Sequence, residues 1–223
     1  RNHTATHMLH AALRQVLGQH VQQAGSLVAE DRLRFDFTHV SPVQDKELLE
    51  IQSLVNRKIR DNIIVDNTET TYKEALSKGA LAFFGDKYGH MVNVVTISGD
   101  SIFSVEMCGG THLQSTGHVG YFRIVSESSI GSGLRRMEAV TGEFAEKVVE
   151  DNFALVNAVA SGLSVGVKQI ESKLESVLNQ LENSKKKDNI EFESDHKDIV
   201  DALIHSVCAI GPISLITGAI DGK

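Results

Sequence analysis

The chain has 223 residues, of which 41% are hydrophobic and 23% are charged. This composition is typical of a folded globular protein and excludes a disordered or collagen-like chain. Two widely separated cysteines, Cys108 and Cys208, do not fit a disulfide-stapled secreted scaffold. The longest largely apolar stretch, 207–220, is interrupted by glycine and proline and falls short of the ~20 residues that a membrane span needs. We therefore expect a soluble, cytoplasmic protein without membrane contact.

The net charge of −7 is concentrated in the C-terminal part. Residues 1–142 carry 14 basic against 15 acidic side chains, whereas residues 143–223 carry 8 against 14. A nearly neutral N-terminal part leaves room for a local basic patch, although composition alone does not indicate RNA binding. The arginines available for such a patch are Arg32, Arg34, Arg123, Arg135 and Arg136.

The first part of the chain predicts a helix, a strand and a second helix. Apolar residues over 3–17 recur at the helical spacing, and residues 32–38 alternate apolar and polar as a half-buried strand does. We expect Ser41 to cap the second helix, with Gln44 completing a capping box, and the helix to run to about Asn62.

Extended segments dominate the next part, around a short helix over 72–78. Strands are expected over 63–66, 68–71, 91–97, 101–107 and 120–126. Runs of strands with inserted helices favour an α+β fold with a mainly antiparallel sheet and packed helices.

Beyond Gly142 the patterns become helical. Residues 143–161 predict one helix, and the apolar residues of 167–181 step by three and four, which is the a/d spacing of a coiled coil. We expect a helical hairpin, with 185–189 as its solvated end.

A short helix over 198–207 and a strand over 212–220 should follow. Three parts are therefore predicted: a domain over 1–142, a helical hairpin or coiled-coil connector over 143–195, and the truncated start of a globular domain over 196–223.

Four metal-ligand side chains stand at complementary spacings. His3 and His7 are four residues apart on a predicted helix, so both imidazoles project from one face. Cys108 and His112 enclose two glycines that let the chain fold back and bring the imidazole beside the thiol. Three nitrogens and one sulfur suit tetrahedral Zn²⁺. A closed site would be structural, whereas a free position would allow hydrolysis.

Several residues near these ligands are open to two interpretations. Thr4, beside His3, and Gln23, in a predicted loop, are candidate catalytic residues, or else a helix cap and a turn residue. Glu106 shares the strand face of Cys108 and is either part of the site or a solvated strand position. His10 lies three residues after His7 and is read as a surface or satisfied polar residue, although it could replace His3 as a ligand.

The segment 129–136 is a glycine-rich loop candidate. Its backbone N–H groups could approach a phosphate, with Arg135 and Arg136 supplying charge for tRNA binding. Alternatively, both arginines are structural and pair with carboxylates such as Glu127 or Glu138.

Two stretches of the sequence resemble a known family. They read HTATHMLHAALRQVLGQHVQQAGSLVAEDRLRFDFTH and EMCGGTHLQSTGHVGYFRIVSESSIGSGLRRMEAVTG. Together they look like the editing domain of alanyl-tRNA synthetase, over residues 1–142. The rest is similar to the helical connector of that enzyme and to the opening of its C-terminal globular domain.

The resemblance implies post-transfer editing, the hydrolysis of serine or glycine wrongly esterified to alanine tRNA, as part of an alanine–tRNA ligase. The zinc ligands of that family correspond to His3, His7, Cys108 and His112, and a glutamine implicated in editing corresponds to Gln23. The implied partner is alanine tRNA, with self-association through the C-terminal region of the full-length protein. The aminoacylation domain would precede the present chain, which is therefore not expected to charge tRNA.

Three alternatives share part of the pattern. Threonyl-tRNA synthetase editing domains and free-standing AlaX-type deacylases also carry HxxxH and CxxxH motifs. CGGTH and SGLRRMEAVTG match the alanyl enzyme better than the threonyl one, and a free-standing deacylase should not continue into a connector and a second module. The third alternative is a zinc-stabilised module that binds tRNA without catalysis.

Overall fold

The computed structural model describes residues 1–82, 89–205, 207–210 and 213–216. The chain divides into two units, Arg1–Asn152 and Phe153–Lys223. The expected α+β class is confirmed, because helices accompany three sheets whose strands all pair in antiparallel fashion.

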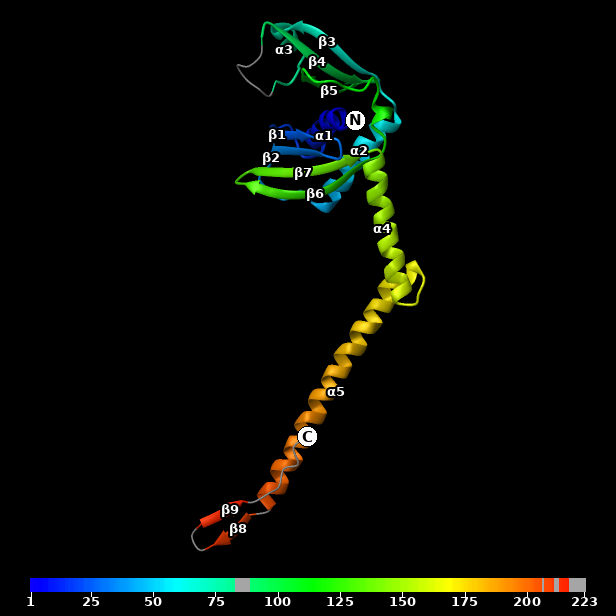
Figure 1. The fold of residues 1–223 in the computed structure, drawn as a ribbon. Helices are drawn as coiled ribbons and strands as arrows, with labels where there is room; N and C mark the ends of the chain where they lie inside the picture. The colour runs from blue at the N-terminus through cyan, green and yellow to red at the C-terminus, as the bar shows by residue number, and fades with distance from the viewer. Residues whose placement is uncertain (83–88, 206, 211–212, 217–223) are drawn as a thin grey trace. The chain divides into compact units, whose positions relative to one another are not determined.

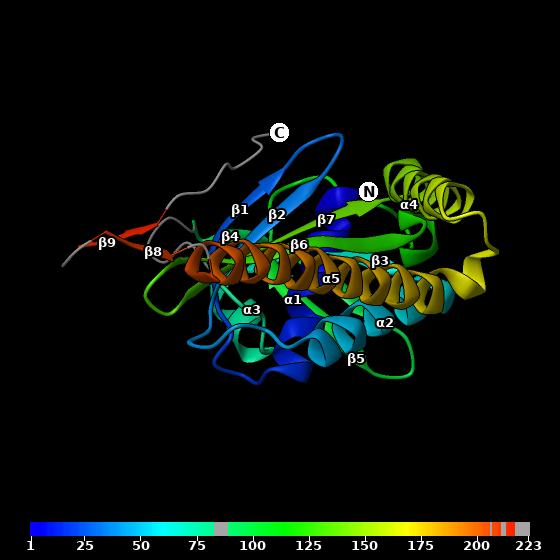
Figure 2. The ribbon, with the colours of Figure 1, turned by 90° about the horizontal axis from the view of Figure 1, so that it is seen from below.

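Helix α1 (Asn2–Val16) is the central element of the first unit. It contacts strands of both larger sheets and lies side by side with α2 (Asp45–Arg60), as Figures 1 and 2 show. Met8, Leu9 and Leu13 are fully buried in the core, as the helical spacing predicts. A helix enclosed in this way has almost no exposed side, so its polar residues also face protein.

A four-stranded sheet has the order β1-β2-β7-β6. Its strands are β1 (Gln23–Val28), β2 (Leu33–Thr38), β6 (Phe122–Gly131) and β7 (Leu134–Thr141). The side chains of Phe35, Phe37 and Met137 are completely buried. They belong to the same core cluster as the apolar residues of α1.

A three-stranded sheet has the order β3-β4-β5 and carries the short helix α3 (Tyr72–Ser77). Its strands are β3 (Val65–Thr71), β4 (Met91–Ser98) and β5 (Ile102–Met107). Leu81 adds an isolated parallel bridge to Glu106 of β5. This sheet places β5 directly against α1, so residues before and at Cys108 face the helix.

Three local expectations need correction. Gln23 is not in a loop, because it begins β1 and pairs with Phe37 of β2. The capping box of α2 is formed by Gln44 and Glu47 rather than by Ser41, and the Gln44 N–H donates to the Glu47 carboxylate at 2.8 Å.

The glycine-rich segment 129–136 is also not an open loop. Most of it belongs to the β6–β7 hairpin, whose turn places Gly133 at φ +70°, a conformation that favours glycine. The two extended segments expected at 63–66 and 68–71 are instead one continuous strand, β3, which begins at Val65.

Helix α4 (Glu143–Gly162) contains the division between the two units. A 3₁₀ turn over Val167–Gln169 leads into α5 (Ile170–His205), so the expected helix end at 185–189 and the boundary at 195 both fall inside one helix. Leu174 is 48% exposed and Leu181 54%, so within the described chain no hairpin buries this a/d seam.

The last described residues form a hairpin of β8 (Val207–Ile210) and β9 (Ile213–Ile216). Its first strand replaces the helix end expected at 207, and the strand expected over 212–220 is confirmed for its described part. Residues 212 and 217–220 of that expectation lie outside the described residues. Among the described helices none alone is long and apolar enough to cross a bilayer, and Glu143–Gly162 with Val167–Lys185 passes only as a bent pair.

Asn56 generates a prediction about the stability of the first unit. It is 7% exposed, its amide donates to the Phe122 carbonyl at 2.8 Å, and its carbonyl accepts from the Phe122 N–H at 3.0 Å. Asn56→Ala should lower the free energy of unfolding by about 2 kcal/mol, because both backbone groups stay buried without partners. Urea denaturation measures this loss. Asn67→Ala, at an exposed position of β3, should cost less than ~0.5 kcal/mol, and equal losses would contradict the role of Asn56.

Candidate metal centre

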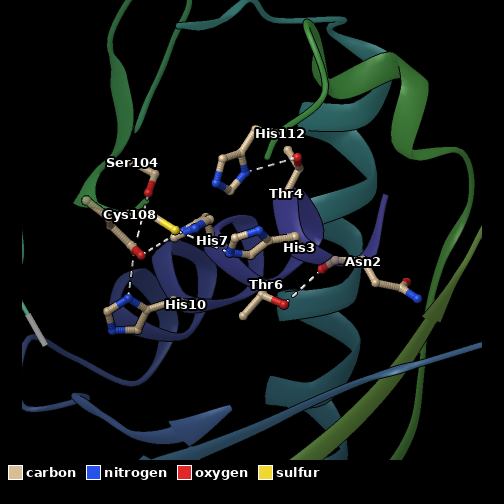
Figure 3. A network of polar contacts seen from close by, with 10 residues as sticks. Asn2, His3, Thr4, Thr6, His7, His10, Ser104, Cys108 and His112 are labelled. Atoms are coloured by element: carbon tan, nitrogen blue, oxygen red, sulfur yellow. Dashed lines mark hydrogen bonds and ion pairs between the residues drawn. The ribbon is translucent and has the colours of Figure 1, made fainter. Parts of the chain in front are cut away.

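Four side chains of metal-ligand type converge in the first unit. His3, His7, Cys108 and His112 each offer a ligand atom, and these atoms all lie within 4.8 Å of one another. Figure 3 shows His3 and His7 of α1 projecting toward Cys108, with His112 opposite them. The His3 Nε2 to Cys108 Sγ distance is 3.2 Å, and the His3 and His112 ring centroids are 4.1 Å apart.

Other contacts anchor the first turn of α1, which carries His3. The Asn2 amide donates to the carbonyls of Ala29 and Glu30 at 2.8 and 3.0 Å. Its carbonyl oxygen accepts from the Thr141 hydroxyl at 2.7 Å. These bonds join the helix start to β7 and to the segment between β1 and β2, so the first ligand does not depend on a frayed helix end.

The three histidines are held through Nδ1 by protein groups. His3 Nδ1 donates to the Thr111 carbonyl at 3.2 Å, and His7 Nδ1 donates to the Glu106 carboxylate. His112 Nδ1 lies 3.4 Å from the Thr4 hydroxyl. The opposite nitrogen, Nε2, therefore faces the cluster in each ring, which is how metal-binding histidines are commonly oriented.

Two of these Nε2 atoms indicate a ligand. The Nε2 atoms of His7 and His112 are buried and have no hydrogen-bond partner among the described residues. Buried polar atoms normally find a partner, and exceptions call for an explanation such as an ion. A metal ion coordinated by the four side chains would satisfy both.

The turn between Cys108 and His112 fits closely against His3. A Cβ at Gly110 would lie 2.1 Å from the His3 Cε1 atom, which no real contact allows, whereas a Cβ at Gly109 would meet nothing within 4 Å. Only the second glycine of the motif is therefore required for this approach.

The electrostatics of the cluster favour an ionised sulfur. Burial opposes ionisation of Cys108, but the neighbouring imidazoles of His112, His3 and His7 lower the pKa of the thiol to about 3. Burial likewise lowers the pKa of His7, yet interactions with the Cys108 sulfur and the Glu106 carboxylate raise it overall to about 9. The thiolate is thus available as a ligand, as metal binding requires.

Glu106 and His10 complete the polar region. Glu106 is only 2% exposed, so its interpretation as a solvated strand position is wrong. His10 is fully buried rather than at the surface, and its Nδ1 donates to the same carboxylate at 2.8 Å. Burial raises the pKa of Glu106, but the bonds from both histidines hold it at about 2.

A sequence signal for this extension exists. His3, His7 and His10 follow one another at spacings of four and three, which places all of them on one helical face. Glu106 and Cys108 are two residues apart, so they lie on the same face of an extended strand.

The two candidate catalytic residues lie in different surroundings. Thr4 is 1% exposed, and its hydroxyl accepts from the Leu113 N–H at 3.1 Å while contacting His112. Gln23 lies in a surface hollow with Arg14 and Leu81, and no hydrogen bond of the described chain joins it to the four donors. The structure thus brings Thr4 against a ligand and leaves Gln23 outside the cluster.

The two arginines lie on opposite faces of β7. Arg135 makes a bidentate ion pair with Glu127 at 2.5 and 2.6 Å, and both side chains are largely buried. Arg136 makes a bidentate pair with Asp36 at 2.7 and 2.8 Å and remains 33% exposed.

A hollow of about 760 Å³ opens beside the cluster. His3 and Thr111 line one side of it, and Glu30, Glu143 and Phe144 line other parts. The four donors therefore adjoin a space that a molecule from solvent can enter.

Residues 92–138 match the family model of the threonyl and alanyl tRNA synthetase second additional domain. This stretch runs from β4 into β7 and includes Cys108 and His112. This stretch of the chain is therefore similar to a domain of threonyl and alanyl tRNA synthetases.

The chain is similar over most of its length to alanine–tRNA ligases. It is 50% identical to that of Pseudothermotoga lettingae over 83% of this chain, and 44% identical to that of a Thermoanaerobacter species over 99%. Identity to the ligase of Hydrogenovibrio crunogenus is 45% over the whole chain. The matches cover 21–25% of these relatives, so the chain spans about a quarter or less of their length. The resemblance to a part of alanyl-tRNA synthetase is thus confirmed.

The glycine pair gives a matched test of the cluster. Gly110→Ala should weaken Zn²⁺ binding at least tenfold, because the added methyl group displaces the His3 ring from the other donors. Gly109→Ala should bind Zn²⁺ as the unchanged chain does. Competition with a coloured chelator measures both dissociation constants. Equal affinities for the two variants would show that His3 does not contribute a ligand.

Proposed function

We propose that this chain is the editing part of an alanine–tRNA ligase and hydrolyses the ester of alanine tRNA mischarged with serine or glycine. The observation that carries the proposal is the convergence of three imidazoles and the Cys108 sulfur beside an accessible hollow. Similarity to alanine–tRNA ligases along the whole chain supports alanine tRNA as the partner.

Zn²⁺ is the proposed metal, because three imidazoles and one thiolate suit tetrahedral zinc better than hard cations. His3, His7, Cys108 and His112 would hold it. When bound, such an ion supplies positive charge that can polarise a carbonyl or bind a hydroxyl group. The unpartnered Nε2 atoms of His7 and His112 support this assignment.

The need for such a site follows from the size of the amino acids. A pocket built for alanine cannot exclude the smaller glycine, and serine adds a hydroxyl group that a pocket rejects only weakly. A second site that favours a hydroxyl group can separate serine from alanine, because alanine cannot make that interaction. The ester is already activated, so orienting water and stabilising the oxyanion suffice.

Thr4 and Gln23 take different parts in this proposal. The Thr4 hydroxyl is occupied by Leu113 and His112, so Thr4 acts by positioning a ligand. Gln23 lies in an open hollow, where its amide is available to the tRNA end or to the attacking water. Replacing Gln23 should therefore lower turnover without changing the metal content.

The similarity favours a ligase part over the alternatives. A free-standing AlaX-type deacylase would not be expected to match ligases through α4 and α5 as well as the first unit. A tRNA-binding module without catalysis remains the outcome in which the chain binds Zn²⁺ and tRNA but cleaves no ester.

The 223-residue chain should hydrolyse serine esterified to alanine tRNA and should leave alanine esterified to the same tRNA intact. Release of labelled serine and alanine measures both rates. Chelation, or Cys108→Ala, should reduce serine release by at least 100-fold, because either change removes the metal or one of its ligands.

Cys208→Ala is the control, since it removes the other cysteine and leaves the motif unchanged. Equal release of serine and alanine would argue against the selectivity, and no release with Zn²⁺ bound would favour the non-catalytic module.

For tRNA contact we propose Arg136 rather than Arg135. Arg34 lies 3.6 Å from the Asp36 carboxylate that Arg136 already holds, and the Arg136 side chain is 33% exposed whereas that of Arg135 is 11% exposed. Arg136→Ala should reduce the log–log salt slope of tRNA binding by roughly one unit, for seryl and alanyl tRNA alike.

Arg135→Ala should instead lower the melting temperature by several degrees, because Glu127 stays buried without its partner, and should leave the salt slope unchanged. A reduced slope for Arg135→Ala alone would reverse the two roles.

A further inference from the structure

Glu106 is a buried carboxylate held between two histidines of one helix. One oxygen accepts from His7 Nδ1, and the other accepts from His10 Nδ1 at 2.8 Å. The Ser104 hydroxyl donates to this second oxygen at 3.3 Å. An ionised carboxylate buried in protein is costly unless donors surround it, so this set of contacts is a built arrangement rather than a chance approach.

The contacts determine which nitrogen of His7 carries the proton. An ionised carboxylate only accepts hydrogen bonds, so the His7 nitrogen that it contacts must be Nδ1–H. In a neutral imidazole the lone pair is then on Nε2. That atom is buried, has no hydrogen-bond partner among the described residues, and is one of the four converging ligand atoms.

We propose that Glu106 is a positioning residue of the metal centre, which holds His7 as an Nε2 ligand and uses His10 to fix its own orientation. This inference rests on the metal site of the proposed function and adds residues that are not ligands themselves. Its basis is the packing of α1 against β5. This packing places the imidazoles of His3, His7 and His10 opposite Cys108 and Glu106.

His10 explains why the carboxylate cannot turn away. Its ring is fully buried and packs against Phe35 of β2 with 5.2 Å between ring centroids. The Glu106 oxygen bound to His10 is thereby fixed from the side of the larger sheet, and the other oxygen is aimed at His7. Figure 3 shows the labelled side chains of Ser104, His10 and His7 close to one another.

The carboxylate also balances charge. A divalent ion bound by one thiolate and three neutral imidazoles leaves one net positive charge beside the buried side chain of His7. The Glu106 carboxylate supplies the matching negative charge. It contacts His7, which would be a ligand of the ion, and does not bind the ion itself. Outer partners of this kind typically change metal affinity by 10- to 100-fold when they are removed.

Glu106→Gln tests the proposal with almost no change of volume. A glutamine side chain has one acceptor oxygen and one donor NH₂, so it can accept from only one of the two histidines. Either His7 changes its protonated nitrogen and loses Nε2 as a ligand atom, or His10 changes its protonated nitrogen or loses its bond, and in every case the negative charge is lost. We expect a Zn²⁺ dissociation constant raised 10- to 100-fold, measured by chelator competition on the 223-residue chain.

Glu127→Gln is the matched control. Glu127 is also a largely buried carboxylate with a bidentate cation partner, Arg135, but it belongs to the β6–β7 hairpin and contacts none of the four donors. This variant should lose thermal stability and keep the Zn²⁺ affinity of the unchanged chain. A comparable loss of Zn²⁺ affinity in both variants would assign the effect to general destabilisation and overturn the proposal.

A measurement on the unchanged chain decides the question even if Glu106→Gln does not fold. Long-range ¹H–¹⁵N correlation spectra of the Zn²⁺-loaded protein should show His7 protonated at Nδ1 and coordinated through Nε2. Coordination through Nδ1, or an unaltered Zn²⁺ affinity in folded Glu106→Gln, would overturn the role of Glu106. Absence of Zn²⁺ binding in the unchanged chain would instead refute the metal site itself.

Discussion

The packing of α1 between two sheets is the constraint on which the first unit depends. A helix covered on so many sides cannot turn its polar residues to water, so each of them needs a protein partner or a ligand. The apolar residues of α1 meet the larger sheet, and its histidines meet β5 and the following turn. The same contact that closes the core therefore assembles the candidate metal centre, and a change in helix position would alter both.

The hydrophobic patterns predict much of this fold because burial is strong where the elements meet. The helical spacing of Met8 and Leu9 and the alternation of Phe35 and Phe37 each reflect a face turned to the core. By contrast β1, one of the two edge strands of the larger sheet, has mostly exposed side chains and no apolar face to detect. Gln23 was therefore expected in a loop, since nothing local distinguishes an exposed edge strand from an irregular segment.

The candidate site was predictable where its residues are spaced along one element. His3 and His7 lie on one face of a helix, and Cys108 and His112 are joined by a short turn, so each pair follows from local geometry. Its surroundings depend on long-range contacts, as the pairing of Arg135 with Glu127 and of Arg136 with Asp36 illustrates. The long α5 shows the opposite limit, because the charged segment 185–189 predicts a helix end, whereas the helix continues through it to His205.

The separation of the ligands in the sequence has a consequence for folding order. Cys108 and His3 are 105 residues apart, and strands of both sheets lie between them in the sequence. In a small zinc finger the ligands are neighbours, and the metal can organise a chain that is otherwise unfolded. Here closing so long a loop carries an entropy cost that the sheets and α1 must meet first. A metal ion would therefore bind after the topology of the unit has formed. Its main effect would be to slow the unfolding of the unit rather than to guide its folding.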